Sequence, residues 1–147
     1  MLYFDSAYVA KCYLPESGHE EVTVLAAQDA HLASVVLARL EVAAVFHRKL
    51  REKIISPAIY RELDRQFSDD MTAGIWRFLP ITDAMIVKSQ AAYLTLSATF
   101  FLRSADCLHL CAAAEAGFKE IYSNDRHLLA AASHFGLRGI DVIPVHP

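Results

Sequence analysis

The chain has 147 residues, a formal net charge of −3 and a hydrophobic fraction of 54%. This composition excludes an intrinsically disordered protein and is sufficient for a single folded domain over residues 1–147. The weak negative charge means that a nucleic-acid partner would require a local basic patch. The longest uncharged stretch, Ser89–Leu102, is shorter than the roughly 20 residues of a membrane span, so no membrane association is expected.

The first half of the chain predicts strands that alternate with helices. The apolar run Met1–Phe4 predicts a strand that reaches Asp5 directly, and a helix over Ala7–Tyr13 follows and ends at Pro15. The next predicted elements are a helix over Gly18–Gln28, a strand over His31–Val36, a long helix over Val36–Lys53 capped by Ser34, and a helix starting at Ser56-Pro57.

The second half continues the same alternation. The predicted elements are a strand over Ile75–Leu79, a helix from Thr82 to Ser97, a helix over Ala105–Ala116 opened by Ser104, a strand over Glu120–Ser123, a helix from Asn124-Asp125 to His134, a turn at Gly136 and Gly139, and a strand over Ile140–Ile143. Because these strands are apolar rather than alternating, they favour a parallel sheet covered by helices on both faces. In such sheets the functional site lies beyond the carboxyl ends of the strands.

Several common types of site are absent from the sequence. It contains no GxGxxG, no Walker lysine motif, no GxSxG, no CxxC and no HExxH. The three cysteines, Cys12, Cys107 and Cys111, form no disulfide framework, and Cys107 and Cys111 are expected in the core. The N-terminal segment has an acid where a signal peptide carries basic residues, so we expect a cytoplasmic protein.

Four carboxylates stand out because a solvated surface position does not readily explain them: Asp5, Glu41, Asp106 and Asp125. Asp5 and Asp125 each follow a predicted strand, and Asp106 begins an otherwise small and apolar helix. Glu41 lies in VVLARLEVAAVF, where one arginine is the only other charged residue. Burying such a carboxylate without a partner would cost several kcal/mol.

Each acid also has a purely structural explanation. Asp5 and Asp125 could cap the helices that follow them. Asp106 could stabilise the dipole of its own helix, and Glu41 could form a core ion pair with an arginine. These alternatives remain open for each residue taken singly.

Taken together, the four acids favour a metal site. Carboxylates held close together repel one another, and a hard divalent cation such as Mg²⁺ or Mn²⁺ removes that repulsion. A site of this kind can activate water for attack on a phosphodiester. Ser123, two residues before Asp125, could add a hydroxyl contact there.

The four acids and their surroundings resemble those of a PIN domain. The matching segments are YFDSAYVAKCYLPESG, LARLEVAAVFHRK, RSADCLHLCAAAEAG and IYSNDRHLLAAASHFGL, which span almost the whole chain. Within that family, the length and the lack of appendages resemble the VapC-type toxins of bacterial toxin–antitoxin pairs.

The resemblance implies a three-layer α/β/α domain around a central, parallel, five-stranded sheet. It implies an Mg²⁺- or Mn²⁺-dependent endoribonuclease acting on tRNA or rRNA, with Asp5 and Asp106 as direct metal ligands. It assigns Glu41, Asp125 and Ser123 to the same catalytic site. It also implies a homodimer and a small antitoxin that inserts a basic side chain into the active-site groove.

Two further groups of side chains bear on RNA binding and assembly. The basic cluster consists of His47, Arg48, Lys49, Arg51, Lys53, Arg61 and Arg65, and it suits either phosphate binding or a solvated face. Arg103 and Arg126 adjoin the proposed site and could contact the scissile phosphate or pair with Glu41. The apolar stretch 92–102 is expected in the core or at a dimer surface.

Four other functions compete with this interpretation. An aspartyl-phosphate phosphatase typically has Asp-x-Asp after its first strand, whereas this chain has Asp5-Ser6-Ala7, and the acidic pair of a phospho-acceptor receiver is also absent. A non-catalytic RNA-binding or adaptor module would not need the four acids. A PIN ribonuclease outside a toxin–antitoxin pair would need them equally.

Overall fold

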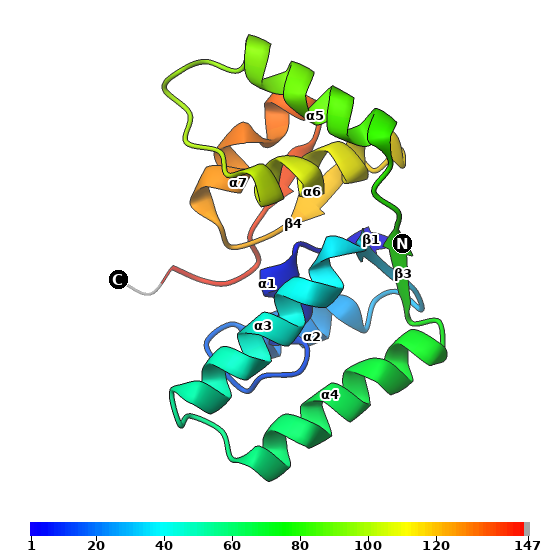
Figure 1. Cartoon of the computed structure of the whole chain (residues 1–147), viewed down its shortest axis with the longest axis vertical. Helices are drawn as coiled ribbons and strands as arrows, with labels where there is room; N and C mark the ends of the chain where they lie inside the picture. Colours follow the sequence, from blue (N-terminus) through cyan, green and yellow to red (C-terminus); the bar gives the residue numbers. More distant parts are fainter. Residues whose placement is uncertain (146–147) are drawn as a thin grey trace.

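The computed structural model describes residues 1–145, which form short strands surrounded by helices (Figure 1). The strands are β1 (Leu2–Tyr3), β2 (Leu32–Val35), β3 (Trp76–Leu79), β4 (Glu120–Tyr122) and β5 (Arg138–Ile140). The helices are α1 (Ser6–Lys11), α2 (His19–Ala26), α3 (Leu37–Arg51), α4 (Pro57–Thr72), α5 (Asp83–Thr95), α6 (Ser104–Glu115), α7 (Arg126–Ala131) and the 3₁₀ helix η1 (Ala132–Phe135).

All strand pairs are parallel, as predicted, but the strands form two sheets rather than the single five-stranded sheet that we expected. One sheet has the order β1-β2-β3, and the other pairs β4 with β5. The sheets meet at one isolated parallel bridge between Phe4 and Tyr122. Pairing stops there because β1 is only two residues long and the chain turns into α1 directly after Asp5.

This arrangement places β1 and β4 side by side while their connections run in opposite directions. From β1 the chain proceeds to β2 and β3, whereas β5 lies on the far side of β4. The backbone N–H of Asp5 donates to the carbonyl of Tyr122 over 3.1 Å, which holds the ends of the two strands together. Such a reversal of strand order opens a crevice at the carboxyl ends of the strands.

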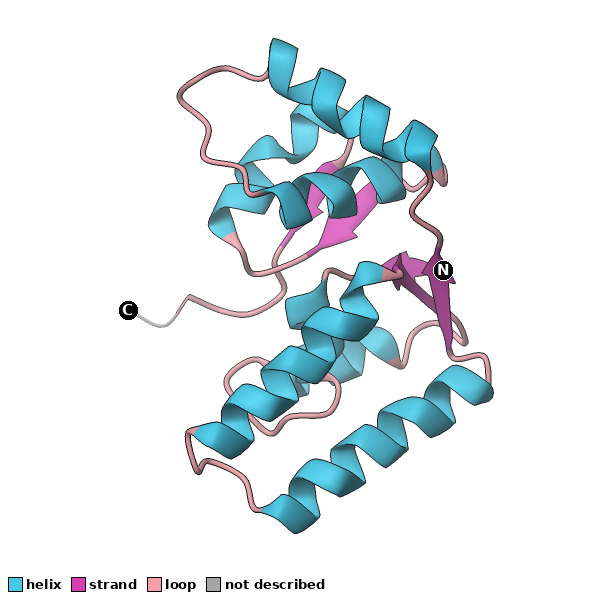
Figure 2. Cartoon of the chain, viewed as in Figure 1, coloured by secondary structure: helices cyan, strands magenta, loops and turns pink. Residues whose placement is uncertain are grey.

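Helices cover both faces of the strands, which confirms the predicted α/β domain. Tyr3, Val35, Leu79 and Ile121 pack into one core with α5, α6 and α7, and this core includes Cys107 and Cys111 as predicted. Phe4, Leu32, Trp76 and Tyr122 pack into a second core with α1 to α4. The same division is visible as two groups of helices on either side of the strands (Figure 2).

The prediction that Ser34 caps the long helix is wrong. Ser34 lies within β2, fully buried, and its hydroxyl donates to the carbonyl of Phe4 over 2.7 Å. The N-cap position of α3 is Val36, which makes no side-chain capping bond. Ser34 therefore satisfies a buried acceptor at the end of β1 rather than a donor at the start of α3.

The final strand also lies earlier than predicted, at β5 (Arg138–Ile140) instead of Ile140–Ile143. Gly136, with φ +71°, makes the turn by itself, and Gly139 lies inside the strand. A Cβ at Gly139 would lie 2.8 Å from a methyl carbon of Leu129, so glycine allows α7 to approach β5 closely. Asp141 ends the strand because its carboxylate accepts from the hydroxyl of Tyr8 and from the N–H of Ile143.

The apolar stretch 92–102 is only partly buried. Leu102 lies in the core, whereas Leu94, Phe100 and Phe101 are exposed, Leu94 by 87%. The hydroxyl of Tyr93 donates to the carbonyl of Leu102 and ties the loop after α5 to that helix. Within residues 1–145, no helix has both the length and the apolar character needed to cross a membrane.

We predict that Ser34→Ala lowers the free energy of unfolding by about 1–2 kcal/mol, because the carbonyl of Phe4 loses a buried donor. Ser89→Ala is the matched control, since the buried hydroxyl of Ser89 has no hydrogen-bond partner within residues 1–145. Its removal should leave the stability unchanged or slightly increased. Urea unfolding of both variants tests this difference, and equal losses in the two would contradict it.

Candidate active site

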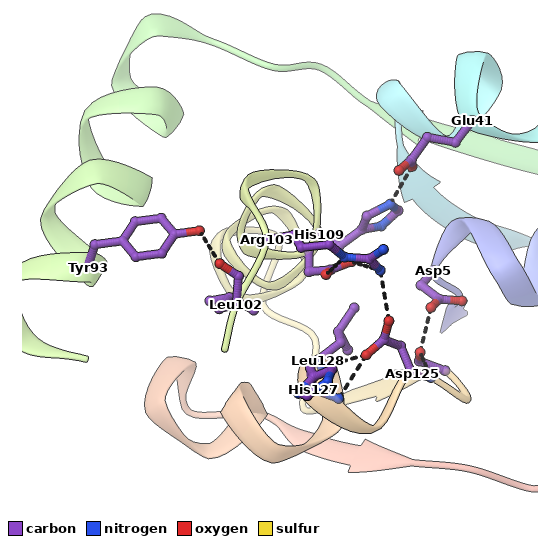
Figure 3. Close-up of polar contacts among 11 residues, drawn as sticks. Asp5, Glu41, Tyr93, Leu102, Arg103, His109, Asp125, His127 and Leu128 are labelled. Atoms are coloured by element: carbon purple, nitrogen blue, oxygen red, sulfur yellow. Dashed lines mark hydrogen bonds and ion pairs between the residues drawn. The ribbon is translucent and has the colours of Figure 1, made fainter. Parts of the chain in front are cut away.

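The side chains that the sequence singled out lie near the carboxyl ends of β1 and β4, and Figure 3 shows Asp5, Glu41 and Asp125 among them. Asp5 directly follows the bridge at the end of β1, while Ser123 and Asp125 follow β4. Asp106 lies in the first turn of α6, and Glu41 comes from the first half of α3. Residues from four separate segments of the chain thus meet at one place.

Asp5 is 4% exposed, and both of its carboxylate oxygens accept hydrogen bonds. One oxygen accepts from the N–H of Tyr8 over 2.9 Å and caps α1, so the structural alternative for Asp5 is confirmed. The other oxygen accepts from the hydroxyl of Ser123. Capping and a role at the site are compatible, because the cap uses only one oxygen.

Ser123 and Asp125 form a turn that fixes the loop after β4. The buried hydroxyl of Ser123 accepts from the N–H of Asp125 over 2.8 Å while it donates to Asp5. Asp125 caps α7 by accepting from the N–H groups of His127 and Leu128. As with Asp5, the cap uses one carboxylate oxygen of Asp125. The other oxygen accepts a hydrogen bond from another side chain.

That side chain belongs to Arg103, whose guanidinium bridges Asp106 and Asp125. Its Nε lies 2.8 Å from Asp106, and one terminal nitrogen lies 2.8 Å from Asp125. Of the two alternatives for Arg103, the direct pair with Glu41 is therefore not formed. Arg103 itself occupies the N-cap position of α6 without a side-chain capping bond, which corrects the prediction that Ser104 caps this helix.

Glu41 pairs with a histidine instead of an arginine. Nε2 of His109 lies 2.9 Å from its carboxylate, and Nδ1 of the same ring lies 3.2 Å from the hydroxyl of Tyr3. The site residues predicted from the sequence do not include His109, for which a solvated or core-edge position is the expected role. The available signal was its spacing, because a residue three positions after Asp106 lies on the same side of α6.

Burial and mutual repulsion shape the acidity of the cluster. Burial, with a smaller contribution from the nearby charge of Asp106, raises the pKa of Asp5 to about 6 despite the lowering effects of His109, Ser123 and Tyr8. Burial also raises the pKa of Glu41, but contacts with His109, Ser6 and Arg103 outweigh it, so the pKa of Glu41 lies below its ordinary value.

The donor set suits a hard divalent cation. Asp5, Glu41, Asp106 and Asp125 offer only carboxylate oxygens, the ligands that Mg²⁺ and Mn²⁺ prefer. The raised pKa of Asp5 shows that its buried charge is incompletely compensated by the protein alone. Among residues 1–145, no three of the acidic, histidine or cysteine side chains are arranged as a ready metal site. Arg103 pairs with Asp106 and Asp125, and His109 pairs with Glu41.

Two solved structures share this fold across essentially the whole chain. The crystal structure of FitAcB from Neisseria gonorrhoeae superposes with a TM-score of 0.69 at 12% identity, covering 99% of this chain and 100% of the other. The structure of FitAB bound to an IR36 DNA fragment gives a TM-score of 0.61 at 10% identity, covering 100% and 99%. Among curated protein sequences, none matches significantly.

The sequence also matches a family model directly. The match is to the PIN domain, and it covers residues 2–133. This range includes β1 to β4, the helices between them and all five predicted site residues. The chain therefore belongs to the PIN domain family.

Proposed function

We propose that the protein is an Mg²⁺- or Mn²⁺-dependent endoribonuclease that cleaves phosphodiester bonds of tRNA or rRNA. PIN domains are typically metal-dependent nucleases. The observation that carries the proposal is the grouping of four carboxylates near the carboxyl ends of β1 and β4, one of which, Asp5, is buried with a pKa of about 6. Such a cluster lowers the stability of the fold, and clusters of this kind are typical of functional sites such as one that binds a cation.

Each residue of the site would have its own role in binding the cation and the RNA. Asp5 and Asp106 would hold the cation, Glu41 would bind it directly or through water, and Asp125 would lie at the border of the same site. Hydrolysis at such a site depends on the Lewis acidity of the bound divalent cation. Ser123 keeps Asp5 and the Asp125 loop in register through its two hydrogen bonds. Arg103, 60% exposed on its side chain, is well placed to pass from these acids to an RNA phosphate.

RNA would reach the crevice along α3. Arg48 lies two turns after Glu41 on that helix, so the two side chains leave it on the same side. Within the basic cluster, Lys49 is instead paired with Glu16, and Arg65 with Glu62 and Asp69. Arg48, together with the exposed Arg126 at the start of α7, is the better candidate for phosphate contact.

We further propose that the protein is the toxin of a type II toxin–antitoxin pair. Support comes from the resemblance to VapC-type chains and from the fold shared with FitAcB and with FitAB, the latter bound to DNA. The exposed apolar side chains Leu94, Phe100 and Phe101 suit the surface of a homodimer. A small antitoxin would insert a basic side chain among the acids that Arg103 now bridges.

Asp5→Asn and Asp106→Asn should each reduce RNA cleavage about 100-fold or more, because even outer-shell partners of metal ligands contribute about 10–100-fold. Purified protein is incubated with mixed tRNA and rRNA in Mg²⁺, Mn²⁺ or EDTA, and products are resolved on sequencing gels. Asp69→Asn, an exposed acid on α4, is the control and should cut normally. Wild-type cleavage by either site variant would remove that residue from the site.

Metal binding should stabilise the protein more above pH 7 than near pH 5. The folded-state pKa of Asp5 is about 6, above the ordinary value, so the metal-free fold favours the protonated carboxyl and loses stability as the pH rises through 6. A cation favours the ionised form and restores that stability. Thermal unfolding with and without Mn²⁺ measures the difference at each pH. Asp5→Asn should abolish the pH dependence, and a shift that is equal at both pH values would contradict the prediction.

Expression of the wild-type chain in bacteria should arrest growth, whereas expression of Asp5→Asn should not. Co-expression with the small protein encoded beside its gene should relieve the arrest. Colony counts after induction, with immunoblots to match protein levels, provide the measurement. Normal growth with abundant active enzyme would contradict the toxin role and favour a ribonuclease outside a toxin–antitoxin pair. Growth arrest that persists in Asp5→Asn would favour a non-catalytic RNA-binding module.

A further inference from the structure

The buried ring of His109 joins three elements of the site. The ring is 1% exposed, with one nitrogen facing the hydroxyl of Tyr3 on β1 and the other facing Glu41 on α3. His109 itself lies on α6, one turn after Asp106. Figure 3 shows the ring reaching from α6 to the carboxylate of Glu41. The two elements that supply Asp5 and Asp106 are therefore the same two that hold Glu41 in place.

The ionisation of Glu41 determines which nitrogen of His109 is the donor. An ionised carboxylate can only accept, so Nε2 of His109 carries the proton that is donated to Glu41 over 2.9 Å. The other nitrogen lies against the Tyr3 hydroxyl, and the Tyr3 ring packs edge-on to the imidazole with centroids 6.1 Å apart. With both nitrogens engaged and the ring packed, His109 has one orientation.

Core packing alone does not account for a histidine at this position. An imidazole in an apolar environment is costly unless its nitrogens are bonded, and an aliphatic side chain would fill the space without that cost. Glu41 is itself only partly buried, so water could solvate it if α6 offered no donor. The distinctive consequence of His109 is a carboxylate held at one position beside the site.

We infer that His109 is a positioning residue that fixes the Glu41 carboxylate for cation binding, with Tyr3 orienting the ring. This inference deepens the proposed nuclease function and rests on it for the reaction, but not for the metal affinity. His109 touches neither substrate nor cation. It acts through Glu41, in the way that outer-shell partners hold metal ligands and typically contribute about 10–100-fold to affinity or activity.

Two buried amide variants separate positioning from structural support. The amide nitrogen of His109→Gln is the same number of bonds from Cα as Nε2 and can still donate to Glu41. The amide of His109→Asn ends near the position of Nδ1 and cannot reach Glu41. Both place an uncharged amide in the same buried site, and thermal unfolding identifies any shared loss of stability. His134→Gln, at an exposed histidine on η1, is the control.

Mn²⁺ binding, followed by electron paramagnetic resonance without RNA, is the first measurement. We expect His109→Asn to weaken Mn²⁺ binding about 10-fold or more, and His109→Gln to remain within about threefold of the wild type. In the cleavage assay the same split should appear in kcat rather than in the KM for RNA. Tyr3→Phe should weaken Mn²⁺ binding less, because it removes only the hydrogen bond to Nδ1 of His109 and leaves the bond to Glu41 in place.

Equal effects of the Asn and Gln variants, or no effect of either on Mn²⁺ binding, would overturn the inference and leave His109 as a structural tie between α3 and α6. The proposed function fails separately, if the wild-type protein binds Mn²⁺ but cleaves no RNA. In that case a difference in Mn²⁺ affinity between the two variants would still support the positioning role.

Discussion

The site depends on holding the negative charge of Asp5 in a buried position at the end of β1. Water is the best solvent for a carboxylate, so removing Asp5 from water must be offset by donors and by nearby positive charge. The fold supplies the N–H of Tyr8 and the hydroxyl of Ser123, yet the pKa of Asp5 remains raised to about 6. A divalent cation would stabilise the ionised form of Asp5. It would also offset the repulsion between Asp5 and Asp106, which itself raises the pKa of Asp5.

The other charges of the site follow from this constraint. Arg103 bridges Asp106 and Asp125, and His109 holds Glu41, so two cationic or donor side chains of the protein itself engage three of the acids. The two side chains differ in burial and in how firmly their contacts hold them. His109 is fully buried and fixed at both ring nitrogens, whereas Arg103 is mostly exposed and held only through its guanidinium. His109 therefore suits a fixed scaffold, and Arg103 suits a group that exchanges partners.

The sheet topology makes this concentration of charge possible. Because β1 is short and touches β4 through a single bridge, the backbone after each strand is free to turn into a helix at the same place. Asp5 caps one of those helices and Asp125 the other, each with one oxygen. Each cap leaves the second oxygen of its acid for other contacts, so the two explanations offered for each acid from the sequence do not exclude one another.

The sequence by itself determined the order and type of the elements and which acids converge, because apolar runs, capping residues and out-of-place carboxylates are local signals. Tertiary structure decided what those acids contact. That Ser34 supports β1, that Arg103 pairs with Asp106 and Asp125, and that His109 holds Glu41 depend on distances between residues far apart in the chain. The division of the strands into two sheets was likewise undetermined, since pairing between β1 and β4 depends on where the chain leaves the sheet and not on composition.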